Sequence, residues 1–258
     1  MDSSFSRLSD IDEKSTVYVL RIAFSFLSAA ALFSLIAVLT YVQAGTPAQT
    51  YVAGLSAIIN AVAAYHYREM IKVRTKAKVS IETEWKIDAL RHSDWAVTMP
   101  LLVLKLYSLI NNPEQDLLLR SVDASALCAV IMVLLGAYAR LGLEELADFK
   151  GMQFTQQILG IACYLGSVAL LVFLLIDLSN AYSGVTNTEV FFAFFLVWPC
   201  YGITAIGAVF LRQGQASSYP RNLALTKDVV YAGLDIFSKA VFAWYTSSAA
   251  FHKSVLGS

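Results

Sequence analysis

The chain has 258 residues, of which 57% are hydrophobic and 15% are charged, and its mean hydropathy is +0.60. A soluble domain of this length carries about 25% charged residues, so the composition indicates an integral membrane protein with room for about six to eight spans. The formal net charge is zero, and nothing in it points to a nucleic-acid partner.

The first 14 residues are polar and acidic, without a basic segment ahead of an apolar one, so no cleavable signal peptide is expected. The cysteines all lie in apolar segments, at spacings unlike any metal motif; they are Cys128, Cys163 and Cys200. We expect buried thiols, with no disulfide and no metal site.

Apolar segments predict seven membrane helices in a single domain that covers residues 1–258, an all-α seven-helix bundle. The expected spans are about 15–43, 48–71, 91–110, 117–141, 154–178, 190–211 and 227–251. Between the second and third spans, residues 72–90 alternate polar and β-branched residues, which predicts a short surface hairpin.

The last span carries an aspartate and a lysine four residues apart, Asp235 and Lys239. An ammonium at the membrane centre costs roughly 2.5–3.5 kcal/mol on insertion scales, and the spacing puts both residues on one helical face. The pair fits a lysine that captures an aldehyde, with Asp235 as part of its counter-ion. It equally fits a lysine that reaches the membrane interface beside a salt-bridge partner.

The third span carries four polar residues on one helical face: Arg91, Asp94, Thr98 and Lys105. A line of ionisable groups in a membrane helix indicates an ion or proton path. The alternative is that Arg91 and Lys105 bracket the span at its interfaces, with Asp94 paired to Arg91. That alternative does not account for Lys105, which lies roughly 16 Å along the helix from Asp94.

Four motifs together resemble the microbial rhodopsins. The pattern R-x-x-D-W-x-x-T-x-P at 91–100, followed by Lys105, resembles their third helix, and L-D-x-x-x-K at 234–239 resembles their retinal-binding seventh helix. W-x-x-Y at 198–201 is similar to their retinal-pocket pattern, and Y-H-Y at 65–67 resembles a stretch of the proteorhodopsins. The resemblance covers the whole seven-span layout.

The resemblance implies a light-driven outward proton pump, a transporter and not an enzyme, with all-trans retinal bound to Lys239 as a protonated Schiff base. Asp94 would be the counter-ion and proton acceptor, Asp235 the second carboxylate and Arg91 the gating arginine. Lys105 falls where outward pumps usually carry a carboxylate proton donor, so it resembles the rarer lysine-donor variant. Desolvation at an apolar helix end favours its neutral form, although Lys105 also fits a lysine that reaches the interface.

The resemblance also implies which residues surround the retinal. They are Trp95, Leu102, Met132, Gly136, Trp198 and Tyr201. Tyr67 would hydrogen-bond near Asp235, and Thr98 would line the Schiff-base side of the pocket. His66 would pair with Asp94, which would couple their titrations, although a packed histidine in an aromatic layer fits the residues too.

The chain departs from the family pattern at several positions. They are Met99 in place of a threonine, Pro199 before the pocket tyrosine instead of after it, and Ala205 in place of an aromatic residue. Lys227 and Asp228 stand where some pumps keep a releasing glutamate, so no release group is assigned. Arg68, Glu69 and Asp228 are candidates for an aqueous vestibule.

The family has its N-terminus outside the cell, which places residues 72–90 outside as well. Lysine and arginine concentrate on that side of the chain, so the positive-inside rule favours the reverse orientation. A photosensor, a light-gated channel, an inward pump and a retinal-free transporter therefore remain alternatives. We expect a multi-pass protein of a bacterial cell membrane, surrounded by lipid and forming a homo-oligomer, a trimer or a pentamer.

Overall fold

The structure is a computed structural model that describes residues 3–45, 47–77, 79–109, 121–148, 154–181, 188–212 and 221–248. These residues form seven α-helices and no strand, so the expected seven-helix class is confirmed. The helices are α1 (Ser3–Ala44), α2 (Pro47–Lys76), α3 (Ile81–Tyr107), α4 (Val122–Asp148), α5 (Phe154–Ala181), α6 (Thr188–Arg212) and α7 (Arg221–Asp235). Helix α7 passes directly into a π-helical segment, η1 (Ile236–Val241), and helix continues to residue 248.

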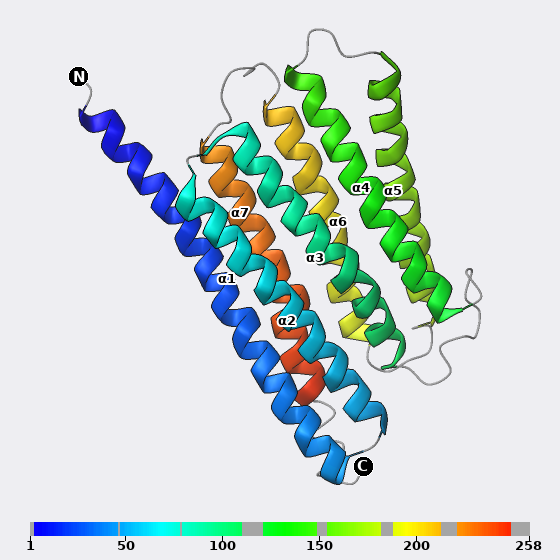
Figure 1. Cartoon of the computed structure of the whole chain (residues 1–258). Coiled ribbons are helices and arrows are strands. Elements are labelled where there is room, and N and C mark those ends of the chain that lie inside the picture. The colour runs from blue at the N-terminus through cyan, green and yellow to red at the C-terminus, as the bar shows by residue number, and fades with distance from the viewer. Residues whose placement is uncertain are drawn as a thin grey trace.

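The helices lie side by side as an elongated bundle (Figure 1). Helix α1 packs along α2 and α7, α3 lies between α2 and α4, and α5 packs on α4. At one end of the bundle the Tyr41 hydroxyl of α1 donates a hydrogen bond to the Ser247 carbonyl at 2.6 Å, which joins α1 to the end of the last helix.

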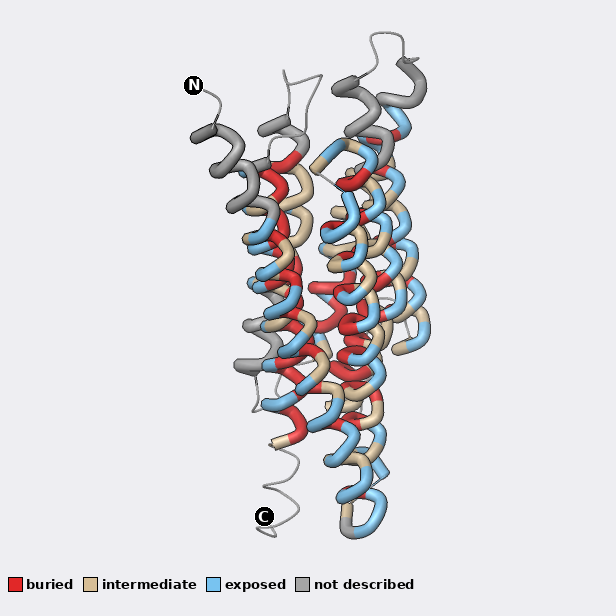
Figure 2. The backbone as a smooth tube through the Cα atoms, turned by 60° about the vertical axis from the view of Figure 1, so that its left-hand side comes forward, coloured by how far each residue is buried: buried red, intermediate tan, exposed pale blue. Residues whose placement is uncertain are grey.

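Buried residues line the inner faces of the helices, while the outward faces are exposed (Figure 2). The outward faces of α1 and α4 carry large apolar side chains, including Leu32, Ile36, Leu127 and Leu134, a surface that suits lipid better than water. Three described helical segments are long and apolar enough to cross a membrane: Lys14–Gln43, Val122–Ala139 and Ile158–Ala181. Helices α2, α3 and α7 instead carry buried charged residues, which lower their hydropathy.

The hairpin predicted for residues 72–90 is wrong, because α2 continues to Lys76 and α3 begins at Ile81. Ser80 caps α3: its Oγ accepts a hydrogen bond from the Thr83 N–H at 3.2 Å. Two glutamates in the first turn, Glu82 and Glu84, complement the helix dipole. Alternation of polar and apolar residues was therefore a poor guide here, since the buried polar positions follow helical spacing.

All three cysteines have free thiols. Cys128 is buried as expected, but Cys163 and Cys200 are partly exposed, so the expectation of three buried thiols is wrong for those two.

Candidate functional site

A buried lysine between two carboxylates lies at the centre of the bundle. Lys239, on the π-helical segment, is 1% exposed. Its Nζ lies 2.5 Å from Oδ2 of Asp94 on α3 and 2.9 Å from Oδ1 of Asp235 on α7. One cation and two carboxylates thus meet inside the protein, and such buried charges require close partners. We call these three residues the Lys239 centre.

Asp235 is held by hydrogen bonds from two other helices. The Tyr67 hydroxyl of α2 donates to its Oδ2 at 2.8 Å, and the Tyr201 hydroxyl of α6 donates to its Oδ1 at 2.9 Å. The Tyr201 hydroxyl also lies 3.0 Å from Oγ of Ser238. Asp235 therefore has a fixed position, and each of its carboxylate oxygens accepts a hydrogen bond from a tyrosine.

Asp94 differs from Asp235 in that only one of its two carboxylate oxygens has a partner. Oδ1 of Asp94 is buried and has no hydrogen-bond partner among the residues that the structure describes. The Thr98 hydroxyl donates to the Asp94 backbone carbonyl at 3.0 Å and not to its carboxylate. A carboxylate with one ion-pair contact and one free oxygen is the member of the Lys239 centre best suited to take up a proton.

The expected pairing of His66 with Asp94 is wrong for this structure. Nδ1 of His66 lies 2.9 Å from the Val62 carbonyl of its own helix, and its ring stands edge-on against Tyr65. No hydrogen bond joins it to Asp94 within the described ranges, since the ring is held by its own helical turn.

Arg91 is also bonded away from Asp94, although the two residues lie one turn apart on α3. Its guanidinium donates to Asp88 at 3.1 Å and to Asp228, and it lies 4.9 Å from the centre of the Tyr231 ring. The alternative pairing of Asp94 with Arg91 at an interface is therefore not observed, because Arg91 is 1% exposed and has other carboxylate partners.

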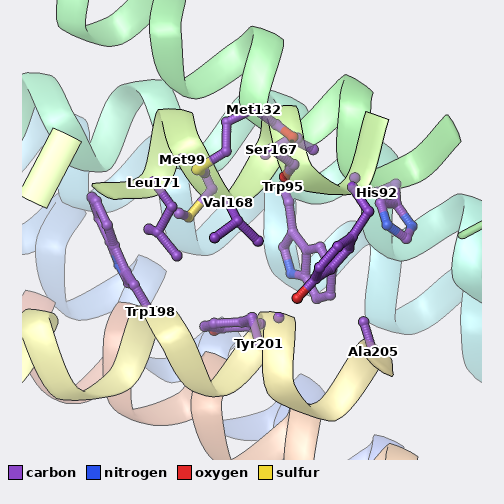
Figure 3. A pocket seen from close by; sticks show the side chains of 14 residues that line it. His92, Trp95, Met99, Met132, Ser167, Val168, Leu171, Trp198, Tyr201 and Ala205 are labelled. Atoms are coloured by element: carbon purple, nitrogen blue, oxygen red, sulfur yellow. Dashed lines mark hydrogen bonds between the residues drawn. The ribbon is translucent and has the colours of Figure 1, made fainter. Parts of the chain in front are cut away.

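A largely apolar cavity is linked to the Lys239 centre through Tyr201, although none of the three residues of the centre is among its lining residues (Figure 3). Trp95 and Trp198 both line it, with Val168 and Leu171 between them in this view, and Tyr201 of α6 forms another part of the wall. Trp95 is the neighbour of Asp94, and Tyr201 bonds Asp235, so the wall of the cavity is continuous with the carboxylates.

Five of the six residues expected around the retinal line this cavity: Trp95, Met132, Gly136, Trp198 and Tyr201. Leu102 does not; it is 1% exposed within the hydrophobic core. Met99 and Ala205, two of the positions at which the chain departs from the family pattern, also line the cavity. The remaining lining residues were not indicated by any sequence motif: His92, Val133, Tyr164, Ser167, Val168, Leu171 and Gly202.

Helix α5 supplies much of that unexpected wall. Ser167 donates a hydrogen bond to the Met132 carbonyl at 2.9 Å. A Cβ added at Gly136 would lie 3.3 Å from Oγ of Ser167, so the close approach of α4 and α5 favours glycine there. Neither contact has a signal in the local sequence, because both depend on how two distant helices meet.

Lys105 lies buried near the opposite end of α3 from Arg91. It is 1% exposed, and its Nζ lies 4.1 Å from the centre of the Phe242 ring. Among the described residues no carboxylate forms an ion pair with Lys105, and its amine instead contacts the face of an aromatic ring. Burial excludes a lysine that reaches the interface in this structure.

The residues present fit a covalently bound retinal. An elongated apolar ligand suits the aromatic cavity, and η1 carries a primary amine, that of Lys239, that can form a covalent bond with a carbonyl group. The carboxylates of Asp94 and Asp235 provide the negative charge that a cationic nitrogen needs in a buried site.

The fold and the Lys239 centre define a class: a seven-helix membrane protein with a buried lysine between two carboxylates. A family model described as "Bacteriorhodopsin-like protein" matches residues 15–252. The chain belongs to this family of multi-pass membrane proteins, for which binding of retinal is typical. Comparison with curated proteins gives no match.

Solved structures with the same fold are microbial rhodopsins. The rhodopsin of Exiguobacterium sibiricum is 19% identical with a TM-score of 0.70, over 93% of this chain and 98% of that one. Xanthorhodopsin, described as a light-driven ion pump with dual chromophore, is 19% identical with a TM-score of 0.71, over 94% of each chain. The light-driven proton pump of Coccomyxa subellipsoidea is 19% identical with a TM-score of 0.65, over 91% and 96%. At these identities the likeness shows the fold.

Proposed function

We propose that this protein is a light-driven outward proton pump. The observation that carries the proposal is the Lys239 centre, in which one buried amine touches two carboxylates beside an aromatic cavity. The family of the chain includes light-driven proton pumps, which supports a transporter.

All-trans retinal, covalently held by Nζ of Lys239, would supply the absorption of light and a change of shape. Trp95 and Trp198 would hold it from the cavity walls, and Tyr201 would fix the position of Asp235 beside it. Met132 and Gly136 of α4 would bound the far part of the cavity. These contacts exclude water, which strengthens the electrostatic interactions of the buried charges.

Asp94 is the proton acceptor of the proposed cycle. Its Oδ2 contacts the lysine nitrogen directly, and its Oδ1 is free to carry a proton. Both oxygens of Asp235 already accept hydrogen bonds from tyrosine hydroxyls. The two carboxylates thus have different proposed roles: Asp94 takes up and releases a proton, and Asp235 balances the positive charge on the Lys239 nitrogen.

Lys105 is the proposed proton donor for the second half of the cycle. A buried amine without a carboxylate partner can hold a proton transiently and pass it on at low cost, since no ion pair must be broken. The distance to Asp94 along α3 is roughly 16 Å, so transfer from Lys105 toward the Lys239 centre needs water between them.

The direction of pumping rests on the resemblance to microbial rhodopsins, which places the Arg91 end of α3 outside the cell. The distribution of lysine and arginine favours the opposite orientation. An inward pump is therefore the second candidate, and it is distinguished by the sign of the pH change.

Illumination of intact cells that express the protein with added retinal tests the proposal. An outward pump acidifies the medium, and a protonophore abolishes the signal; Lys239→Ala, which cannot hold the retinal, serves as the control. Alkalinisation of the medium would support the inward pump instead. A coloured protein with no pH change would overturn transport and leave a photosensor.

A further inference from the structure

Six buried charged residues form a closed ring at the Arg91 end of α3, apart from the Lys239 centre. The contacts run from Arg74 to Glu84, Glu84 to Lys227 (2.8 Å), Lys227 to Asp88 (2.9 Å), Asp88 to Arg91 (3.1 Å), Arg91 to Asp228, and Asp228 back to Arg74 (2.9 Å). Positive and negative charges alternate around it. We call this set the ion ring.

The ion ring is buried and electrically balanced. None of its six side chains is more than 7% exposed, and three cations face three carboxylates. It joins α2, α3 and α7, so it fixes the ends of the helices that carry the Lys239 centre. Asp228 is 0% exposed, so it does not line an aqueous vestibule as the sequence had led us to expect.

Arg91 is the link between the ion ring and the Lys239 centre. Both terminal nitrogens of its guanidinium bond carboxylates of the ring, Asp88 and Asp228. Asp94, one turn further along α3, makes its ion pair with Lys239. The ring therefore draws Arg91 away from Asp94.

We propose that the ion ring holds Arg91 away from Asp94 and that its net charge sets how readily Asp94 takes up a proton. Arg74, Glu84 and Lys227 are positioning residues in this account, since they act through Arg91 and touch neither Asp94 nor Lys239. The significance for pumping rests on the proposed function, because it requires Asp94 to be the acceptor.

The charges that face Asp94 from every side make this effect measurable. Lys239 contacts Asp94 from the last helix, where Asp235 is the second partner of the same lysine. His66 lies on α2, and Arg91 lies one turn away on α3. The intact ion ring adds no net charge to this set. Loss of one ring charge leaves a full unit of charge in a water-poor interior, where screening by salt is weak.

The sign of the effect depends on which ring charge is lost. Removal of a cation makes the interior more negative and favours protonated Asp94. Removal of a carboxylate makes the interior more positive and favours ionised Asp94. It also frees Arg91 to move toward Asp94. Glu84 lies ten residues before Asp94 on α3, about 15 Å along the axis, so either change should shift the titration of Asp94 by about 0.5–1 pH unit.

The test is a pH titration of visible absorbance of the retinal-bound protein, since protonation of a counter-ion changes the colour. Lys227→Met is expected to move the midpoint to higher pH and Glu84→Gln to lower pH. The double variant restores neutrality and should return close to the wild-type midpoint. Arg74→Met provides a second cation variant with the same expected sign. Glu82→Gln is the matched control, because Glu82 is 79% exposed two residues away.

Shifts of the same sign in both single variants, or no shift in either, would overturn the proposal and leave the ion ring a structural clamp. The retinal-free protein offers a second readout: the infrared C=O band of protonated Asp94, identified by its loss in Asp94→Asn, should titrate with the same opposite shifts. Failure of the wild type to form a pigment would contradict the proposed function alone, since the infrared titration still tests the ring.

Discussion

Nζ of Lys239 lies 2.5 Å from Oδ2 of Asp94, across a separation of 145 residues in the chain. Asp235, only four residues from Lys239, is the second carboxylate contact at 2.9 Å. The two carboxylates differ in what else they bond, because Asp235 receives two tyrosine hydroxyls and Asp94 has a free oxygen. This asymmetry leads to the first prediction.

Asp94→Asn is expected to form pigment but to lose light-induced acidification at least about 10-fold, since the acceptor is gone. Asp235→Asn is expected to lower stability more, because two buried hydroxyl donors lose a charged partner, at about 1–3 kcal/mol. Pigment yield, initial acidification rates and thermal unfolding of the two variants measure this. Equal effects of the two substitutions on the acidification rate and on thermal stability would contradict the division of roles.

Lys105→Met is expected to slow the return of the dark absorbance at least about 10-fold, because the proton donor is lost. A small weak acid such as azide, which can carry a proton into the site, should restore the rate. Stability should change little or improve, since a buried amine without a carboxylate partner is replaced by an apolar side chain of similar length. Flash photolysis with and without azide measures this rate. An unchanged rate in Lys105→Met without azide would show that Lys105 is not on the proton path.

His66→Gln is expected to change acidification and its pH dependence only slightly, because His66 bonds the Val62 carbonyl and not Asp94. Tyr67→Phe is the matched comparison on the next position of α2. It removes a 2.8 Å hydrogen bond to a buried carboxylate, which should cost about 1.5–3 kcal/mol of stability. A large shift of the absorbance titration in His66→Gln would mean that His66 reaches Asp94 in the working protein.

Gly136→Ala is expected to hinder retinal uptake or shift the absorption maximum, because its Cβ would lie 3.3 Å from Oγ of Ser167. Gly202 also lines the cavity, but a Cβ there meets nothing within 4 Å, so Gly202→Ala should bind retinal nearly as wild type. The two variants are compared by their rates of pigment formation from added retinal. The opposite order of effects would show that the α4–α5 contact does not limit the cavity.

Local spacing predicted the parts of the site that lie on one helix. Asp235 and Lys239 are one turn apart, and Arg91, Asp94 and Lys105 lie on one face of α3; all five are buried in the structure. These positions follow from the helical period alone.

Contacts between distant helices were not predictable from local pattern. The ion ring joins Glu84, which lies in the segment predicted as a surface hairpin, to Lys227, at the predicted start of the last span. Helix α3 begins at Ile81, ten residues before the predicted span. The α5 wall of the cavity likewise depends on the approach of α4. His66 was placed on Asp94 by resemblance, but its own helical turn holds the ring nitrogen.

Flash-induced infrared spectroscopy of the retinal-bound protein tests the central claim most directly, since it reports which carboxylate gains a proton. We predict that a C=O band of a protonated carboxylic acid appears after the flash, disappears in Asp94→Asn and persists in Asp235→Asn. A band that survives in Asp94→Asn would contradict the account, because the proton would then have gone to another group.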